Sequence, residues 1–229
     1  MATGLTRRQL CLACGITASA GFVDGIGFIH LGGYFVSFMS GNSTRAGADL
    51  AEGDLLGWGK AVGLVAAFVF GVILASLVTS ARTMARAPSR AITPQLRAIW
   101  LSVALLALAA VCGTVPAAGP QGAEAAVAPL IAAAMGAVNS TFTRGGEVSV
   151  GLTYMTGALV KAGQLFAARL RGVPETGWLR YAALWLAIAV GSAAGATSYL
   201  AAGLPVLWAA VALLGFCAAL VWWRRRSRT

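Results

Sequence analysis

Nine residues of this chain are polar, charged or small in positions where they could bind a small solute. They are Asp24, Ser40, Gly41, Asn42, Arg45, Asn139, Thr156, Gly157 and Lys161. Asp24 and Asn139 each interrupt a long apolar stretch, where a polar side chain can coordinate a solute or carry a proton. Arg45 and Lys161 each follow a glycine by four residues, and their charge would attract an anion. The remaining residues open short helical stretches, whose first N–H groups need partners.

A structural role competes with solute binding in both groups. Asp24 and Asn139 could each form a hydrogen bond that holds one apolar helix against a neighbouring segment. Arg45 and Lys161 could extend to the nearer membrane surface and end their segments there. The residue types fit both interpretations, so both stay open.

The sequence offers little for catalysis, metal binding or cofactor binding. It has one histidine, His30, and seven carboxylates, and no nucleophile–base arrangement or phosphate-binding loop is present. Cys11 and Cys14 have the spacing of a metal or redox pair, but no second pair accompanies them. We therefore expect no enzyme activity, no catalytic residues, no metal and no cofactor.

The candidate residues recur because the chain contains one pattern twice. Residues 35–47 (FVSFMSGNSTRAG) and 151–163 (GLTYMTGALVKAG) have identical Met, Gly, Ala and Gly residues at a separation of 116 positions. Residues 21–24 and 136–139 correspond at a separation of 115. This indicates two repeats, about 9–116 and about 124–223, within a single domain that covers residues 1–229.

The composition places both repeats in a lipid bilayer. Hydrophobic residues make up 59% of the chain, charged residues 10%, and the mean hydropathy is +0.80. Six apolar stretches have about the length that crosses a bilayer; they are residues 10–33, 61–80, 98–112 with flanks, 125–142, 181–200 and 205–223. Residues 34–44 and 148–160 are too short and predict re-entrant or broken helices. We expect an all-α polytopic membrane protein with six transmembrane helices.

The charge pattern predicts how the chain is oriented. With six spans, every arginine except Arg45 falls on the same side of the membrane as the two termini. The positive-inside bias identifies that side as the cytoplasmic one. Asp49, Glu52 and Asp54 then belong to an outside loop. Three spans per repeat is an odd number, so the repeats would have inverted topologies. The net charge of +10 reflects this anchoring, and we expect no nucleic-acid partner.

The spacing of small residues predicts close helix packing. Gly21 and Gly25 are four positions apart, as are Gly191 and Gly195. This spacing suits helix contacts within one molecule or in a homodimer.

Two motifs resemble a known family. Residues 21–24 (GFVD) followed by residues 35–42 (FVSFMSGN) are similar to the pattern of the YoaK-like bacterial inner-membrane proteins of unknown function. Here Ser40 stands where that pattern has threonine, and Val138 precedes Asn139 where it more often has glutamine. The resemblance covers nearly the whole chain. It implies a multi-pass protein of the bacterial inner (plasma) membrane, and it brings no substrate.

These observations together predict a small-solute transporter or channel. Inverted repeats with broken segments place a binding site where the repeats meet. The alternative is a structural or accessory membrane subunit without transport activity, and a membrane-embedded enzyme comes third.

Overall fold

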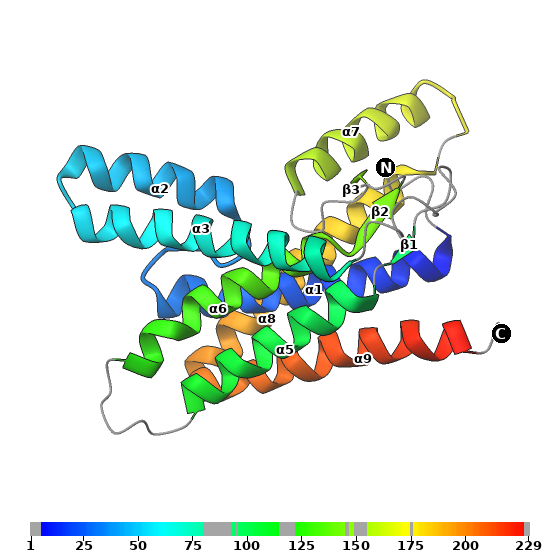
Figure 1. Cartoon of the computed structure of the whole chain (residues 1–229). Helices are drawn as coiled ribbons and strands as arrows, with labels where there is room; N and C mark the ends of the chain where they lie inside the picture. Colours follow the sequence, from blue (N-terminus) through cyan, green and yellow to red (C-terminus); the bar gives the residue numbers. More distant parts are fainter. Residues whose placement is uncertain are drawn as a thin grey trace.

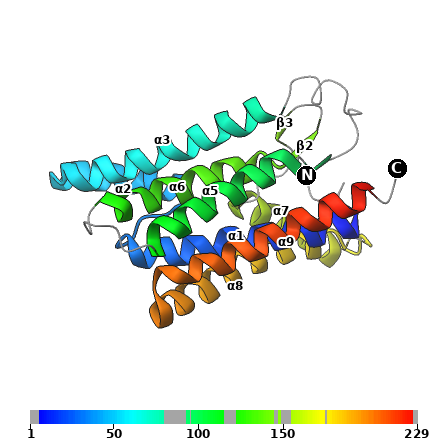
Figure 2. The same ribbon diagram turned by 60° about the horizontal axis from the view of Figure 1, so that its bottom comes forward.

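The computed structural model describes residues 6–79, 93–94, 96–114, 122–144, 147–148, 155–174 and 176–226. In this part of the chain there are eight α-helices. They are α1 (Arg7–His30), α2 (Met39–Glu52), α3 (Leu55–Val78), α5 (Leu96–Thr114), α6 (Gly122–Asn139), α7 (Met155–Leu170), α8 (Trp178–Ala202) and α9 (Leu207–Arg226). A 3₁₀ turn, η2 (Leu204–Val206), precedes α9. The helices form an elongated bundle with both termini at one end (Figures 1 and 2).

In the described residues, five helical segments are long and apolar enough to cross a membrane. They are α1, α3, α5, α8 and the segment Leu204–Trp223, which joins η2 to α9. The sixth expected span corresponds to α6, of which the described residues contribute a shorter apolar helix, Ala125–Asn139. The expected span reached residue 142, but the helix ends at Asn139 and the chain enters a strand at Phe142. The all-helical class is confirmed, with five candidate membrane spans, and the shorter helix α6 packs against α3 and α5.

The first short segment differs from its prediction in length. After α1 the chain turns at Gly32 and Gly33, which both have positive φ. Residues 34–38 are not helical, and α2 then runs for 14 residues from Met39. The helix continues until Gly53, whose left-handed conformation ends it. Asp49, which we expected in an outside loop, is therefore a buried residue of α2.

The second short segment is helical as α7, which begins at Met155. The start of the expected segment, including residues 149–154, lies outside the described residues. Helix α2 packs along α3 and extends toward the end of the bundle remote from the termini, whereas α7 extends toward the end that carries them (Figure 1). The two short helices thus point to opposite ends.

Glycines set the spacing at two helix crossings. A Cβ at Gly21 of α1 would lie 2.2 Å from the carbonyl oxygen of Ile188 in α8. A Cβ at Gly71 of α3 would lie 1.9 Å from the carbonyl oxygen of Ala133 in α6. Comparable contacts occur at Gly25, Gly136, Gly191 and Gly195. The small-residue spacing is therefore used for packing within one molecule.

The described residues include three short strands that were not predicted. They are β1 (Thr93–Pro94), β2 (Phe142–Arg144) and β3 (Glu147–Val148), and they form an antiparallel sheet in the order β1-β2-β3. Thr93 pairs with Thr143, and Thr143 pairs with Val148. Strands of two or three residues are too short to show an alternating pattern. The sheet ties the chain before α5 to the connection between α6 and α7.

Candidate functional site

Asp24 fastens the non-helical segment that precedes α2. The residue is buried, with 7% of its surface exposed. Oδ1 accepts hydrogen bonds from the backbone N–H groups of Val36 at 2.8 Å and Ser37 at 2.7 Å. Oδ2 accepts a third bond from the Ser37 hydroxyl. Because α2 begins two residues later, the carboxylate also lies near the positive end of that helix.

Asn42 holds the same segment from the other side. Its side chain is fully buried. Nδ2 donates to the carbonyl oxygen of Phe35 at 2.6 Å, and Oδ1 accepts from the Phe35 N–H at 2.9 Å. Asp24 and Asn42 together bind backbone groups of residues 35–37, which have no helical partners. Non-helical backbone at membrane depth requires such partners. These hydrogen bonds therefore agree with a structural role for Asp24, in which it holds α1 against the neighbouring segment.

Gly41 has a packing role in this segment. It is the third residue of α2, as expected for a residue that opens a short helix, and its φ is negative. A Cβ here would lie 2.6 Å from the Phe38 ring and 2.7 Å from the Phe35 ring. Gly41 therefore makes room for two aromatic side chains. Ser40 beside it is exposed.

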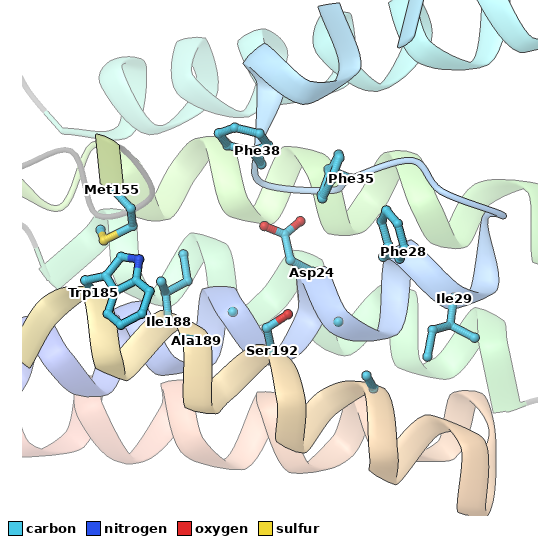
Figure 3. A pocket seen from close by; sticks show the side chains of 13 residues that line it. Asp24, Phe28, Ile29, Phe35, Phe38, Met155, Trp185, Ile188, Ala189 and Ser192 are labelled. Atoms are coloured by element: carbon cyan, nitrogen blue, oxygen red, sulfur yellow. The ribbon is translucent and has the colours of Figure 1, made fainter. Parts of the chain in front are cut away.

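An open cavity of about 660 Å³ lies beside the crossing of α1 and α8 (Figure 3), and three of its lining residues, Phe28, Phe38 and Trp185, are exposed. Residues 35–38 cover one side of it, and Met155 at the start of α7 closes another. Its walls are aromatic and aliphatic, and their main features are Phe28, Phe35, Phe38 and Trp185. Asp24 and Ser192 are polar residues of the lining. An apolar cavity with few polar groups is typical of a small-molecule site.

A second hollow of about 470 Å³ adjoins the first. Gly41, Thr44 and Arg45 line it. The two hollows share Phe28, Phe35 and Phe38. The ring centroids of Phe28 and Phe35 are 5.1 Å apart, and those of Phe35 and Phe38 are 5.2 Å apart. These three rings form an aromatic wall between the hollow that contains Asp24 and the hollow that contains Arg45.

Arg45 belongs to a charged cluster that fastens α2. Its guanidinium lies 3.1 Å from Oδ1 of the buried Asp49 and 4.9 Å from the centroid of the Tyr34 ring. The Tyr34 hydroxyl donates to Oδ2 of Asp49 at 2.7 Å. The Tyr34 hydroxyl and then the Asp49 carboxylate raise the pKa of Arg45 above its usual value, so the guanidinium stays charged.

Lys60 completes this cluster from α3. Its ammonium group lies 4.6 Å from the Tyr34 ring centroid and donates to the carbonyl oxygen of Leu31 at 2.6 Å. Tyr34 and Asp49 were missed in the sequence. The i,i+4 spacing of Arg45 and Asp49 on one helix was the signal that could have found the pair.

The second-half candidates are not lining residues of these hollows. The amide of Asn139 donates to the carbonyl oxygen of Met135 at 2.8 Å, one turn back in α6. Lys161 is exposed and donates to Gln164 at 3.2 Å. As far as the described residues show, neither hollow is lined by Asn139, Thr156, Gly157 or Lys161. Thr153 and Tyr154 of the second motif lie outside the described residues.

Several lining residues were not found from the sequence. Trp185, Ile188 and Ser192 lie on one face of α8 and carry no motif. Their place in the cavity depends on which helix crosses α1. The glycines Gly191 and Gly195 were the available signal, since they indicated that another backbone approaches this part of α8.

Comparison with known proteins gives a family. The family described as "Protein of unknown function (DUF1275)" matches residues 12–220. The chain is also similar to the UPF0700 transmembrane protein RA0705 of Rhizobium meliloti (strain 1021), with 36% identity over 199 residues that cover 87% of this chain and 80% of that protein. No solved structure matches.

Proposed function

We propose that this chain, which belongs to the DUF1275 family of proteins of unknown function, binds a small solute between its two halves and moves it across the bacterial inner membrane. The observation that carries the proposal is the cavity of about 660 Å³ at the crossing of α1 and α8. It is walled by α1 and residues 35–38 from the first half, and by α8 and the start of α7 from the second. Transporters built from repeats bind their solute at such a junction.

The pattern of helix contacts supports an inverted repeat. If α1, α2, α3 and α5 correspond to α6, α7, α8 and α9, then the packing of α1 on α8 corresponds to that of α6 on α3. The pairs α2–α3 and α7–α8 correspond in the same way, as do α5–α6 and α9–α1. The opposite directions of α2 and α7 agree with this relation (Figure 1).

The arginines support a cytoplasmic position for both termini. The starts of α1, α5 and α8 and the ends of α7 and α9 lie at the end of the bundle that carries the termini (Figure 1). These helix ends carry Arg7, Arg8, Arg97, Arg169, Arg180 and Arg226. A membrane face rich in arginine is the cytoplasmic one.

A cavity-filling variant tests the proposal. Ala189 lines the cavity, whereas Ala194 is exposed elsewhere on the same helix. Proteoliposomes containing the unmodified chain are incubated with a mixture of small solutes, and accumulated solutes are identified by mass spectrometry against empty liposomes. We expect Ala189→Phe to abolish the accumulation and the matched control Ala194→Phe to leave it unchanged. Accumulation of no solute, or equal effects of the two variants, would contradict the proposal.

A structural or accessory role is the second candidate. The hydrogen bonds of Asp24 and Asn42 favour it, because they brace a segment without any solute. This role predicts that a second membrane protein co-purifies in a fixed ratio and that Ala189→Phe leaves the assembly intact.

A further inference from the structure

We infer that the cavity at the α1–α8 crossing selects a small organic cation, whose ammonium group lies among the aromatic rings near Asp24. This inference rests on the proposed function and names the solute class for the same site. It differs from the anion preference that Arg45 and Lys161 suggested in the sequence.

The formal charge of the cavity is the first argument. Among the described residues that line it, Asp24 is the one with an ionisable side chain. Its hydrogen-bond partners are the neutral donors of Val36 and Ser37, and no described lysine or arginine forms an ion pair with it. These donors are neutral, so they leave the formal negative charge of the carboxylate without a cationic partner among the described residues. That charge favours a cation.

The first turn of α2 reduces this charge without cancelling it. A helix N-terminus carries about half of an elementary charge. This partial charge is spread over N–H groups on the α2 side of the carboxylate. The helix end therefore offsets only part of the formal charge of the Asp24 carboxylate.

The aromatic walls are the second argument. Phe28, Phe35, Phe38 and Trp185 line the same cavity (Figure 3). The face of an aromatic ring attracts an ammonium group, most strongly in a site without water, and tryptophan is the best of these rings. The other walls are aliphatic, so they suit alkyl groups around the charged nitrogen.

The position of Arg45 is the third argument. It lines the other hollow and forms an ion pair with Asp49. The aromatic wall of Phe28, Phe35 and Phe38 separates it from Asp24. The guanidinium of Arg45 thus lies outside the cavity, and among the described lining residues an anion would find no cationic side chain.

Tetraalkylammonium chlorides are the probe. Binding of tetramethylammonium and tetraethylammonium to the full chain is measured by calorimetry and thermal shift in a maltoside detergent, with equal NaCl as the salt control. tert-Butanol and sodium pivalate serve as neutral and anionic compounds of similar shape. We expect the ammonium ions to bind and the two analogues to bind at least tenfold more weakly. Equal or tighter binding of pivalate, or no binding of any ammonium ion, would overturn the inference.

Two tryptophan variants give a matched comparison. Trp185 lines the cavity, and Trp208 is similarly exposed on α9. We expect Trp185→Leu to weaken ammonium binding by about threefold to thirtyfold, and Trp208→Leu to leave it unchanged. Asp24→Asn should weaken binding as well; if that variant does not fold, the tryptophan pair still decides. An unchanged affinity for ammonium ions in Trp185→Leu would overturn the inference.

The outcomes separate this inference from the proposed function. If Ala189→Phe blocks uptake of a neutral or anionic solute and no ammonium ion binds, the transport function would be supported and the inference of a cation site overturned. If ammonium ions bind and Trp185→Leu weakens that binding, but no solute is taken up, the ammonium site would be supported and the transport function overturned. Loss of the binding in phosphatidylcholine nanodiscs, but not in phosphatidylglycerol ones, would support the ammonium site and identify a lipid headgroup as its occupant.

Discussion

Asp24 shows how one buried carboxylate can replace the backbone partners that a helix supplies to itself. Residues 36 and 37 have no helical partners, and the carboxylate accepts from both N–H groups and from the Ser37 hydroxyl. An aspartate in an apolar span is costly unless protein groups bind it. The same side chain therefore gains its own partners and orders the segment that covers the cavity.

Truncation of Asp24 should destabilise the protein more than its conversion to the amide. Asp24→Ala leaves the three donors of residues 36 and 37 without partners, at about 1–3 kcal/mol for each buried group. Asp24→Asn keeps one acceptor oxygen for the two N–H groups. Thermal unfolding in detergent should give the lowest midpoint for Asp24→Ala and an intermediate one for Asp24→Asn. Equal midpoints for all three proteins would contradict the bracing role.

Two glycines of α3 should respond differently to the same substitution. A Cβ at Gly71 would lie 1.9 Å from the carbonyl oxygen of Ala133, whereas nothing lies within 4 Å at Gly63. Gly71→Ala should lower the free energy of unfolding by about 1–3 kcal/mol or more, because backbone must move. Gly63→Ala should be neutral or stabilising. Urea or SDS titrations of both variants would test this prediction. Equal unfolding midpoints for the two variants would contradict the close crossing of α3 and α6.

Helix α2 depends on contacts outside itself. Asp49 is buried, and it is bound by Arg45 of the same helix and by Tyr34 of the preceding segment. Tyr34 also provides the ring near Arg45 and Lys60. The helix is thereby fastened to α3 at the end of the bundle remote from the termini.

Removal of the Tyr34 hydroxyl should loosen α2 selectively. Tyr34→Phe keeps the ring for Arg45 and Lys60 but removes the hydrogen bond to Asp49. Hydrogen bonds to charged groups contribute about 1.5–3 kcal/mol. Amide hydrogen exchange of α2 should accelerate by about tenfold or more, while exchange in α9 should stay unchanged. Uniform acceleration in both helices would mean that the bond supports the whole fold.

The aromatic wall should control access to the cavity. Phe35 is the central ring of the three, since it contacts both Phe28 and Phe38. Phe35→Ala should join the two hollows. A cysteine introduced at Ser192 should then react several-fold faster with a membrane-impermeant thiol reagent added from outside. The same reagent on proteins without the added cysteine corrects for the four native cysteines. An unchanged rate would show that the wall does not limit access.

The whole molecule can be tested for inverted topology at its two exposed connections. Glu52 lies at the end of α2, and Val173 follows α7. Both residues are exposed. A cysteine at residue 52 should react with an impermeant reagent in intact cells, whereas one at residue 173 should react only after permeabilisation. Reaction of both from the same side would contradict the inverted arrangement and, with it, the proposed site between the halves.

Much of the framework could be predicted because its causes are local. The apolar lengths predicted the helical membrane class, and the repeated motif located Asp24, Asn42 and Gly41, which the structure brings together around residues 35–38. Helix lengths were less predictable. Residues 45–52 look like the start of a polar loop, and they remain helical because the burial of Asp49 and the cap at Gly53 favour it.

The amino-acid sequence by itself determined that this chain is a bundle of apolar helices and which polar residues interrupt them, since hydrophobic length and residue type act within one segment. Only the tertiary structure decided that α8 crosses α1, and so that Trp185 and Ser192 line the same cavity as Asp24 while Arg45 lines the neighbouring hollow beyond three phenylalanine rings. Those relations depend on contacts between segments far apart in the chain. The pattern of residues within one helix can indicate that another helix packs closely, but it does not identify that helix.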